Sequence, residues 1–375
     1  MSGQARPTHG ATLAIDLGAL AGNWRHLRDR VAPAECAAVV KADAYGIGIE
    51  PAVRTLARAG CRTFFVAHIG EAARLRAVAR EAVVYVLNGL PPGSADDFLA
   101  IGARPILGSF EELADWATAS TGRGTRLSAA LHVDTGMNRL GFAPSEAAAV
   151  AADPRLGAID PVLMMSHLTS AEDHEADSAT ERQAETFAAV RATLPFPASL
   201  ANSSGIFHPA VPPLALARPG YALYGGNPTP GRPNPMHPVV RLEAWIVQLR
   251  DVEAGATVGY NGRWTAPGPR RLATLSVGYA DGYPRAAGGT DLNADLPTGA
   301  ALVAGRLCPF VGRVSMDLVV LDVTEVPSGD AVRGAPVTLI GDALDLDEVG
   351  RRAGTIGYEI LTGLGPRYLR RYVNG

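Results

Sequence analysis

The sequence predicts an α/β fold in which a (β/α)8 barrel of the TIM type is followed by a mainly antiparallel β domain. Over the first two thirds of the chain, short apolar runs of strand length alternate with segments of helical spacing. The apolar runs number eight, which is the strand count of a closed barrel. Beyond residue 240 the strand-like runs are separated by turns instead of helices, which is typical of antiparallel sheets.

The eight apolar runs are unbroken, as expected for parallel strands that are buried on both faces. They cover residues 35–41, 63–69, 82–87, 103–107, 127–133, 161–167, 198–202 and 214–218. Helices are expected over 49–60, 71–80, 109–120 and 179–194. Ser109 and Glu112 have the spacing of a capping box, and Gly60 is placed to end its helix. A doubly wound open sheet is the competing topology, but no Gly-x-Gly-x-x-Gly follows the first strand.

The run 226–238 contains five prolines and cannot continue a helix, so we place a domain boundary there. The barrel is predicted over residues 12–238 and the β domain over 239–375. Residues 1–15 exceed what the barrel needs, and we expect them to pack with the β domain. The second domain is expected to contain strands over 242–249, 270–280, 300–312, 317–323 and 336–341, with one helix over 345–354.

Composition narrows the class of protein. The chain has 375 residues, of which 47% are hydrophobic and 19% charged, as in a globular protein of two domains. A net charge of −3, with both signs interspersed, argues against binding to nucleic acid or anionic membranes and favours a small-molecule partner. The sequence shows no secretory leader pattern and no apolar run approaching the roughly 20 residues of a membrane span, so a cytoplasmic location is expected.

No metal site is expected. Three widely spaced cysteines suit reduced core thiols better than disulfides or zinc ligands: Cys36, Cys61 and Cys308. His174 and Glu175 lack the helical spacing of a zinc motif, and we expect both on the surface.

Reactive side chains gather where the predicted strands end. The carboxyl ends of barrel strands converge on one mouth, where barrel enzymes hold their active sites. The residues at these ends are Lys41, Asp134, Arg139, His167, Ser203 and Arg218. The loops after the seventh and eighth strands, where such barrels often hold phosphate, contain "NSSG" and "RPGYALYGG".

Lys41 is the only lysine in the chain, since the other 33 of the 34 basic residues are arginine. A primary amine can lose its proton and attack an aldehyde, which arginine cannot do. A lone amine facing a phosphate site therefore suggests a Schiff base with pyridoxal 5'-phosphate. The alternative is a lysine that biased codon usage has left by chance.

Nine segments resemble alanine racemases, in order and over nearly the whole chain. They are "AVVKADAYGIG", "HVDTGMNRLGF", "MSHL", "LANSSG", "ARPGYALYG", "VGYNGRW", "VGYADGYPR", "VGRVSMD" and "IGYEILTGLGPR". The resemblance implies a pyridoxal-phosphate homodimer with a barrel and a β domain, in which the partner subunit completes each active site. It implies racemisation of L-alanine to D-alanine.

The resemblance also implies roles for individual residues. Lys41 holds the cofactor and is one of two proton-transfer bases, and Tyr260 of the partner subunit is the second. Arg218 faces the pyridine nitrogen and, acting through His167, is expected to favour the Tyr260 phenolate.

The remaining implied contacts concern the phosphate and the substrate. The phosphate is held by Tyr45, Ser203 and Tyr358 and by the backbone amides of Gly220 and Tyr221, with Asn202 beside them. Arg139 meets the cofactor and the substrate carboxylate. Tyr279 and Met316 of the partner line the substrate side, in a pocket suited to a methyl group.

His132 stands where many relatives have a carbamylated lysine that orients the equivalent of Arg139. We hypothesise that His132, or an anion beside it, positions Arg139; a core histidine is the alternative. Three other functions compete with an alanine racemase. A racemase of serine or broader specificity differs around Tyr279 and Met316, a single-barrel cofactor carrier lacks the second domain, and related decarboxylases have an acidic residue in place of Arg218.

Overall fold

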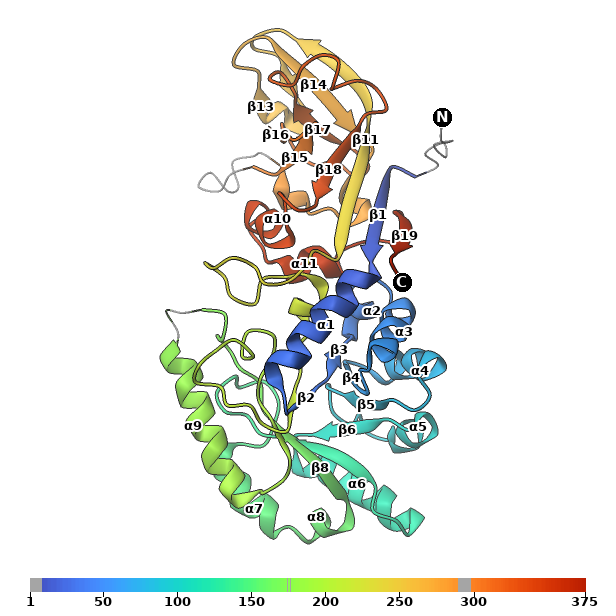
Figure 1. The fold of residues 1–375 in the computed structure, drawn as a ribbon, viewed down its shortest axis with the longest axis vertical. Coiled ribbons are helices and arrows are strands. Elements are labelled where there is room, and N and C mark those ends of the chain that lie inside the picture. Colours follow the sequence, from blue (N-terminus) through green and yellow to red (C-terminus); the bar gives the residue numbers. More distant parts are fainter. Residues whose placement is uncertain (1–8, 174, 176, 289–297) are drawn as a thin grey trace.

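The structure is a computed structural model that describes residues 9–173, 175, 177–288 and 298–375. His174, one of the two expected surface residues, lies outside these ranges, whereas Glu175 is described and exposed. The chain forms two regions stacked along the long axis, a barrel at one end and a β domain at the other (Figure 1).

The predicted barrel is confirmed, and each of the eight apolar runs contains an observed strand. Its first strand is split at Ala37. The strands are β2 and β3 (Glu35–Cys36 and Ala38–Val39), β4 (Thr63–Val66), β5 (Val83–Val86), β6 (Arg104–Leu107), β7 (Ser128–His132), β8 (Asp160–Met165), β9 (Ala198–Ser199) and β10 (Leu216–Ala217). Strands β3 to β9 form one parallel sheet in chain order, and β10 pairs with β2 in parallel.

Backbone hydrogen bonds close the ring where the strands are short. The Arg218 amide donates to the Ala201 carbonyl at 2.9 Å, which ties β10 to the chain after β9. The Val39 amide donates to the Pro219 carbonyl, also at 2.9 Å, which ties β10 to the first strand. The carboxyl ends of β3, β9 and β10 are thereby held side by side.

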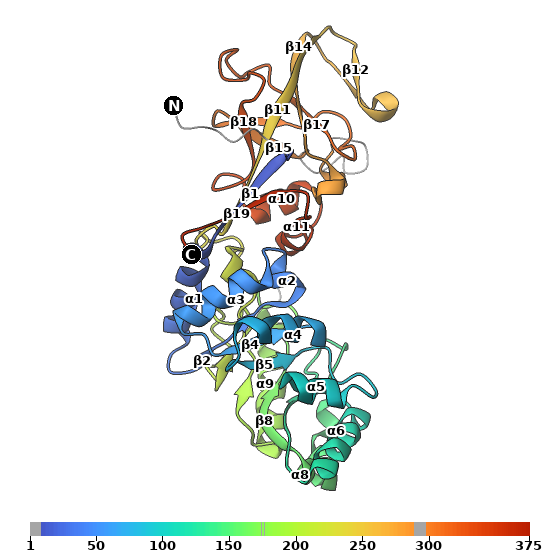
Figure 2. The same cartoon turned by 90° about the vertical axis from the view of Figure 1, so that its right-hand side faces the viewer.

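Helices cover the outside of the barrel (Figures 1 and 2). They are α1 (Leu17–Val31), α3 (Ile49–Ala59), α4 (Ile69–Val78), α5 (Ala95–Ile101), α6 (Phe110–Arg123), α7 (Ala147–Ala152), α8 (Pro154–Ala158) and α9 (Asp177–Thr193). The four helices expected from spacing correspond to α3, α4, α6 and α9. Gly60 ends α3 with φ of 110°, as predicted.

The capping box predicted at Ser109 is only half formed. The Ser109 hydroxyl accepts from the Glu112 amide at 3.2 Å, as the motif requires. The Glu112 carboxylate instead accepts from the amides of Gly108 and Leu90, at 2.6 and 2.9 Å. It therefore joins two loops at the barrel mouth.

The second region is a mainly antiparallel sheet, as predicted. Its strands are β1 (Ala11–Asp16), β11 (Val240–Val252), β14 (Arg270–Leu275), β15 (Ala300–Val303), β16 (Arg306–Pro309), β17 (Val319–Asp322), β18 (Pro336–Ile340) and β19 (Leu369–Val373), with a separate hairpin of β12 (Thr257–Val258) and β13 (Trp264–Thr265). The N-terminal strand β1 pairs antiparallel with β11 and parallel with β19. The domain limits 12–238 and 239–375 stay a prediction.

Two short helices lie between the barrel and the sheet (Figure 1). They are α10 (Leu346–Arg352), which was expected, and α11 (Gly357–Thr362), which was not. The junction is tied by polar contacts, because Arg370 donates to the Gly46 carbonyl at 2.7 Å and Tyr372 donates to the Ile47 carbonyl at 2.8 Å. Across the described residues, no helix has the length and apolar character that crossing a membrane requires.

Candidate active site

A cavity of about 350 Å³ lies between the barrel mouth and α11. Its lining includes most of the residues that the sequence pointed to, although they come from distant parts of the chain. These are Lys41, Tyr45, His167, Asn202, Ser203, Arg218, Gly220, Tyr221 and Tyr358. Lys41, His167 and Arg218 follow β3, β8 and β10, so the barrel brings them together at the carboxyl ends of its strands.

Lys41 opens an unusual left-handed turn. Four consecutive residues without a glycine, Ala42 to Tyr45, have φ between 51° and 55°. This conformation costs roughly 1–2 kcal/mol per residue because Cβ approaches the following carbonyl oxygen, and it normally occurs at single positions. Strain of this kind persists only where surrounding contacts hold it, and it clusters at functional sites.

Carboxylates hold the left-handed turn in place. Glu71, in the first turn of α4, accepts from the Ala42 amide at 2.6 Å and from the Ala67 amide at 2.8 Å. Asp43 accepts from the Ile49 amide at 3.0 Å and from the Arg74 guanidinium at 2.7 Å. The turn is thus fastened at its first two residues to α3 and α4.

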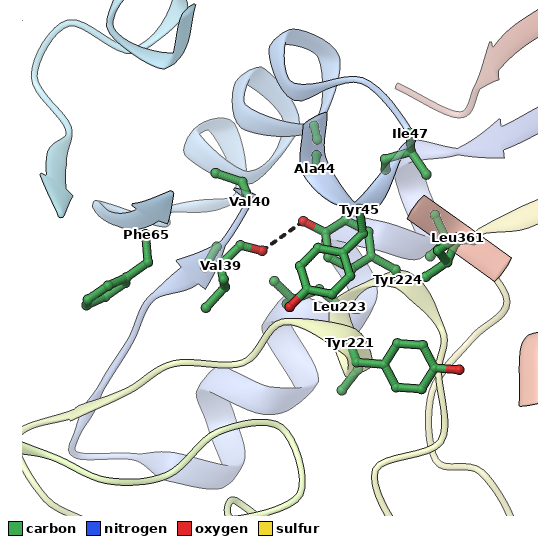
Figure 3. Close-up of a cluster of buried hydrophobic side chains, with 14 of the residues drawn as sticks. Val39, Val40, Ala44, Tyr45, Ile47, Phe65, Tyr221, Leu223, Tyr224 and Leu361 are labelled. Carbon is green, nitrogen blue, oxygen red and sulfur yellow. Dashed lines mark hydrogen bonds between the residues drawn. The ribbon is translucent and has the colours of Figure 1, made fainter. Parts of the chain in front are cut away.

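The last residue of the turn is fixed by aromatic packing (Figure 3). The Tyr45 ring stacks on Tyr224 with centroids 4.6 Å apart. The Tyr224 hydroxyl donates to the Val39 carbonyl at 2.9 Å, which anchors the stack to β3. Lys41 and Tyr45, at the two ends of one strained turn, are thereby both directed into the cavity.

The environment of Lys41 favours the neutral amine. Burial lowers the pKa of Lys41 from its ordinary value, and the positive charge of Arg139 lowers it further. The nearby Glu71 carboxylate opposes this shift. A larger share of the amine is therefore free to act as a nucleophile or a base near neutral pH than for an exposed lysine.

Arg218 is a buried cation without a carboxylate. Its guanidinium donates to the Ser166 carbonyl at 2.5 Å and to the Ser199 hydroxyl. No ion pair to it occurs within the described ranges, and burial lowers its pKa to about 9. Within the described residues, Arg218 therefore forms no salt bridge at the barrel rim. Its uncompensated charge faces the cavity.

His167 is neutral in this setting. Burial and then the charge of Arg218 lower its pKa to about 3. Its backbone carbonyl accepts from the Gln183 amide at 3.0 Å. The influence of Arg218 on His167 is thus electrostatic in the described structure, since the guanidinium directs its hydrogen bonds to Ser166 and Ser199.

The loop after β10 surrounds the side chain of Ser203, which itself follows β9. The Ser203 hydroxyl oxygen accepts from the amides of Gly220 and Ala222, at 3.0 and 3.1 Å. With both lone pairs used, its hydrogen is left to be donated to an acceptor in the cavity. A side chain at position 220 would place Cβ 2.3 Å from the Tyr45 hydroxyl oxygen, so the close approach of Tyr45 requires Gly220.

Tyr358 enters the cavity from α11 and stacks on Tyr221 with centroids 4.0 Å apart. The Tyr221 hydroxyl donates to Asp347 at 2.7 Å, away from the barrel residues (Figure 3). Burial, followed by the Asp347 charge, raises the pKa of Tyr221. Of Tyr221, only the backbone and the ring face are left for a ligand.

Arg139 lies on a well-fixed loop after β7 but does not line this cavity. The Asp134 carboxylate accepts from the amides of Gly136, Met137 and Arg139, at 2.8, 2.8 and 3.0 Å. These bonds fix the loop backbone, and the Arg139 side chain is exposed. The loop therefore presents the guanidinium at the mouth of the barrel.

His132 lines a neighbouring cavity together with Leu140 and Gly141. Its ring is buried, and burial followed by the Arg218 charge lowers its pKa to about 4, so it is neutral. No hydrogen bond joins His132 to Arg139 in the described residues. The hypothesis that His132 positions Arg139 is thus without a direct contact to support it, and the variant with an anion stays a prediction.

Three further predicted residues, besides Arg139, lie outside the cavity. Tyr260, Tyr279 and Met316 are 69%, 40% and 53% exposed and belong to the β domain. The strand β12, which directly precedes Tyr260, lies at the far end of that domain from the barrel (Figure 2). Within one chain, Tyr260 therefore does not line the cavity that contains Lys41.

The sequence analysis did not identify several residues that line the cavity. The cavity is also lined by Val39, Leu87, Ile356, Glu359 and Thr362. The last three belong to α11 or its start, and only Tyr358 had been singled out from that segment. A hydrophobic pattern over six residues gives too few turns to identify such a helix.

Comparison with known proteins agrees with this geometry. The family models described as alanine racemase, N-terminal domain, and alanine racemase, C-terminal domain, match residues 15–228 and 239–372. An alanine racemase from Methylobacterium nodulans is 63% identical over 99% of this chain and 98% of its own length. One from Rhodospirillum rubrum is 47% identical over 96% of both chains.

The fold agrees equally well with a crystal structure. Alanine racemase from Bartonella henselae, which carries covalently bound pyridoxal phosphate, superposes with a TM-score of 0.91 and 38% identity over 98% of this chain and 100% of that one. With matching family models over both regions and relatives of such identity, this chain belongs to the alanine racemase family.

Proposed function

We propose that this protein racemises alanine with pyridoxal 5'-phosphate attached through Lys41. The observation that carries the proposal is one cavity that joins a half-buried amine of lowered pKa, a buried guanidinium without a carboxylate, and a hydroxyl with a free hydrogen. The close relatives named as alanine racemases support it.

The donor set fits this cofactor. An aldehyde needs a deprotonable amine, which Lys41 supplies. A phosphate needs donors, and the Ser203 hydroxyl and the hydroxyls of Tyr45 and Tyr358 face the same cavity. The Arg218 guanidinium would face the ring nitrogen as a donor, and a cation there disfavours protonation of that nitrogen.

When bound, the cofactor withdraws electrons from the substrate Cα and so acidifies the α-proton. The residues of the chain then move that proton. The Lys41 amine takes or returns it on one face, and the Tyr260 hydroxyl of the partner subunit acts on the other. Two bases on opposite faces allow either enantiomer to form.

The exposed position of Tyr260 supports a homodimer. The residue is exposed and belongs to the β domain, close in sequence to the strand β12 at the end of that domain away from the barrel, so in this proposal a second copy supplies it. Tyr279 and Met316, also exposed, would come from the same partner and narrow the substrate side to methyl size, while Arg139 binds the substrate carboxylate. The buried free cysteines are compatible with a cytoplasmic location.

Racemisation of L-alanine, L-serine and L-lysine by the purified protein tests substrate choice, with a clear preference for alanine expected. A subunit-mixing experiment tests the shared site. Lys41→Ala and Tyr260→Phe homodimers should each be nearly inactive, whereas mixed dimers should regain activity because one of their two sites has both bases. Mixed dimers that stay inactive would show that the two bases do not come from different subunits.

A further inference from the structure

Gln183 lies on α9, outside the cavity, and its side-chain amide uses its full hydrogen-bonding capacity. The nitrogen Nε2 donates to the Thr135 hydroxyl at 3.2 Å and to the His167 carbonyl at 3.0 Å. The oxygen Oε1 accepts from the amide and hydroxyl of Thr169, at 2.9 and 3.0 Å. Gln183 is only 3% exposed, so water does not compete for these bonds.

The network continues from Thr135 to the buried cation. The hydroxyls of Thr135 and Ser166 are 2.7 Å apart and hydrogen-bonded, and both residues are buried. The Ser166 carbonyl accepts from Arg218 at 2.5 Å. A continuous buried path therefore joins α9 to Arg218, by way of the ends of β7 and β8.

Three candidate site residues depend on this path. Thr135 follows Asp134, whose carboxylate fixes the loop that carries Arg139. The His167 backbone is bonded to Gln183 directly, and Arg218 is reached through Ser166. Gln183 is the point where the paths to all three meet.

We propose that Gln183 is a positioning residue that sets the spacing of Arg139, His167 and Arg218 for substrate and cofactor. It acts through other residues and does not touch the ligands, because it does not line the cavity. The inference rests on the proposed function for its enzymatic readout. An amide is required, since one terminal group must donate through its nitrogen and accept through its oxygen.

Two variants and a matched control test the role. Gln183→Met keeps the length of the side chain and removes all four bonds. Gln183→Glu keeps the size of the side chain and the oxygen that accepts from Thr169. It replaces the nitrogen that donates to the His167 carbonyl with a carboxylate oxygen, which repels that carbonyl. The control is Thr180→Val on the same helix, because the Thr180 hydroxyl is fully buried and has no hydrogen-bond partner within the described residues.

Three quantities are measured for each cofactor-loaded protein. These come from steady-state kinetics, which give the KM and kcat for alanine, from a binding titration, which gives the dissociation constant of pyridoxal phosphate, and from a pH titration of the cofactor's visible absorbance. We expect Gln183→Met to raise KM and the cofactor dissociation constant about tenfold, and to shift the titration, while Thr180→Val matches the wild type. In Gln183→Glu the defect should lessen as pH falls, because a protonated carboxyl regains a donor.

A purely structural role would lower the melting temperature and the yield of loaded protein, yet leave KM and the titration of loaded sites unchanged. That pattern in both folded variants would overturn the proposal. A wild-type protein that does not racemise alanine would instead refute the proposed function. The cofactor dissociation constants of the same four proteins would still decide the role of Gln183.

Discussion

The left-handed turn after Lys41 makes an unusual prediction about stability, which the variant Ala42→Gly tests. Glycine normally destabilises structured backbone because it loses more conformational freedom on folding. At Ala42, however, φ is 52° and ψ is 51°, where an alanine Cβ is strained and glycine is not. We therefore expect this substitution to stabilise the protein.

The size of the effect follows from two opposing terms. Removing Cβ relieves roughly 1–2 kcal/mol of left-handed strain. The greater freedom of glycine in the unfolded chain offsets roughly 0.5–1 kcal/mol of this. Ala42 is exposed, so little burial is lost. The expected net gain in the free energy of unfolding is about 0.5–1 kcal/mol.

A matched control gives the opposite sign. Ala188 is exposed in the middle of α9, in a right-handed helix, and Ala188→Gly should cost about 1 kcal/mol. Urea unfolding of the cofactor-free protein, followed by fluorescence, compares the two variants with the wild type. If Ala42→Gly lowers the midpoint as much as Ala188→Gly does, the turn is not strained and the reasoning is wrong.

Four further predictions concern the site itself. Ser203→Ala should weaken pyridoxal phosphate binding about tenfold in equilibrium dialysis, because a donor hydroxyl is lost; unchanged binding would remove Ser203 from the phosphate site. Arg218→Lys keeps the charge but cannot satisfy two acceptors with a planar fork, so kcat should fall with little loss of folded protein; a wild-type kcat would argue against a role in the reaction. Glu71→Gln removes the charge that raises the pKa of Lys41, so the pH midpoint for borohydride-trapped capture of the cofactor should move down; a midpoint that stays or rises contradicts this. The pKa values of His167 and His132 are lowered from 6.5 to about 3 and about 4, respectively. Below pH 6.5 the unfolded chain therefore binds more protons than the folded chain. The free energy of unfolding should consequently fall as the pH drops from 6.5 toward 3. The His132 shift alone corresponds to about 3 kcal/mol, which urea titrations at pH 7 and pH 4 would detect.

The barrel could be predicted from sequence because its signal is local and repeated. Each strand is an unbroken apolar run, and the helices between them that were identified, such as α3 and α9, are long enough to show periodicity. The helices α5 and α8 have seven and five residues, which is too short for this pattern. The helix α5 packs against its neighbours α4 and α6, and α8 packs mainly against α6, so their positions depend on the surrounding fold.

The left-handed turn was beyond sequence reasoning for a different reason. The run from Ala42 to Tyr45 has ordinary residues and no glycine, so local preference points to another conformation. The turn is held by Glu71, whose carboxylate comes from a separate helix. Because local propensity opposes this conformation and contacts distant in sequence enforce it, the residues of the turn do not reveal it in the sequence.

Gln183 shows the same limit for the site. Its position in α9 follows from helical spacing, but its partners lie 14 to 48 residues away along the chain. Nothing in the segment distinguishes Gln183 from a surface glutamine until the fold places it between two loops. Thr180, on the same helix, is also buried, yet its hydroxyl has no hydrogen-bond partner among the residues that the structure describes, so burial and sequence position alone do not separate the two.

The two basic residues at the centre of the site differ in how far sequence alone reveals them. Lys41 stands out by composition, because it is the single lysine among 34 basic residues. Arg218 is one of 33 arginines, and composition gives no reason to prefer it. What distinguishes Arg218 among the arginines that the structure describes is burial without a paired carboxylate: Arg74 pairs with Asp43 and is exposed, whereas Arg218 is buried against a carbonyl and a hydroxyl. Burying a cation without a carboxylate is costly, which favours a functional role for the Arg218 charge. Burial of the Arg218 guanidinium against a carbonyl and a hydroxyl is therefore what marks this residue, and it becomes visible only in the three-dimensional structure.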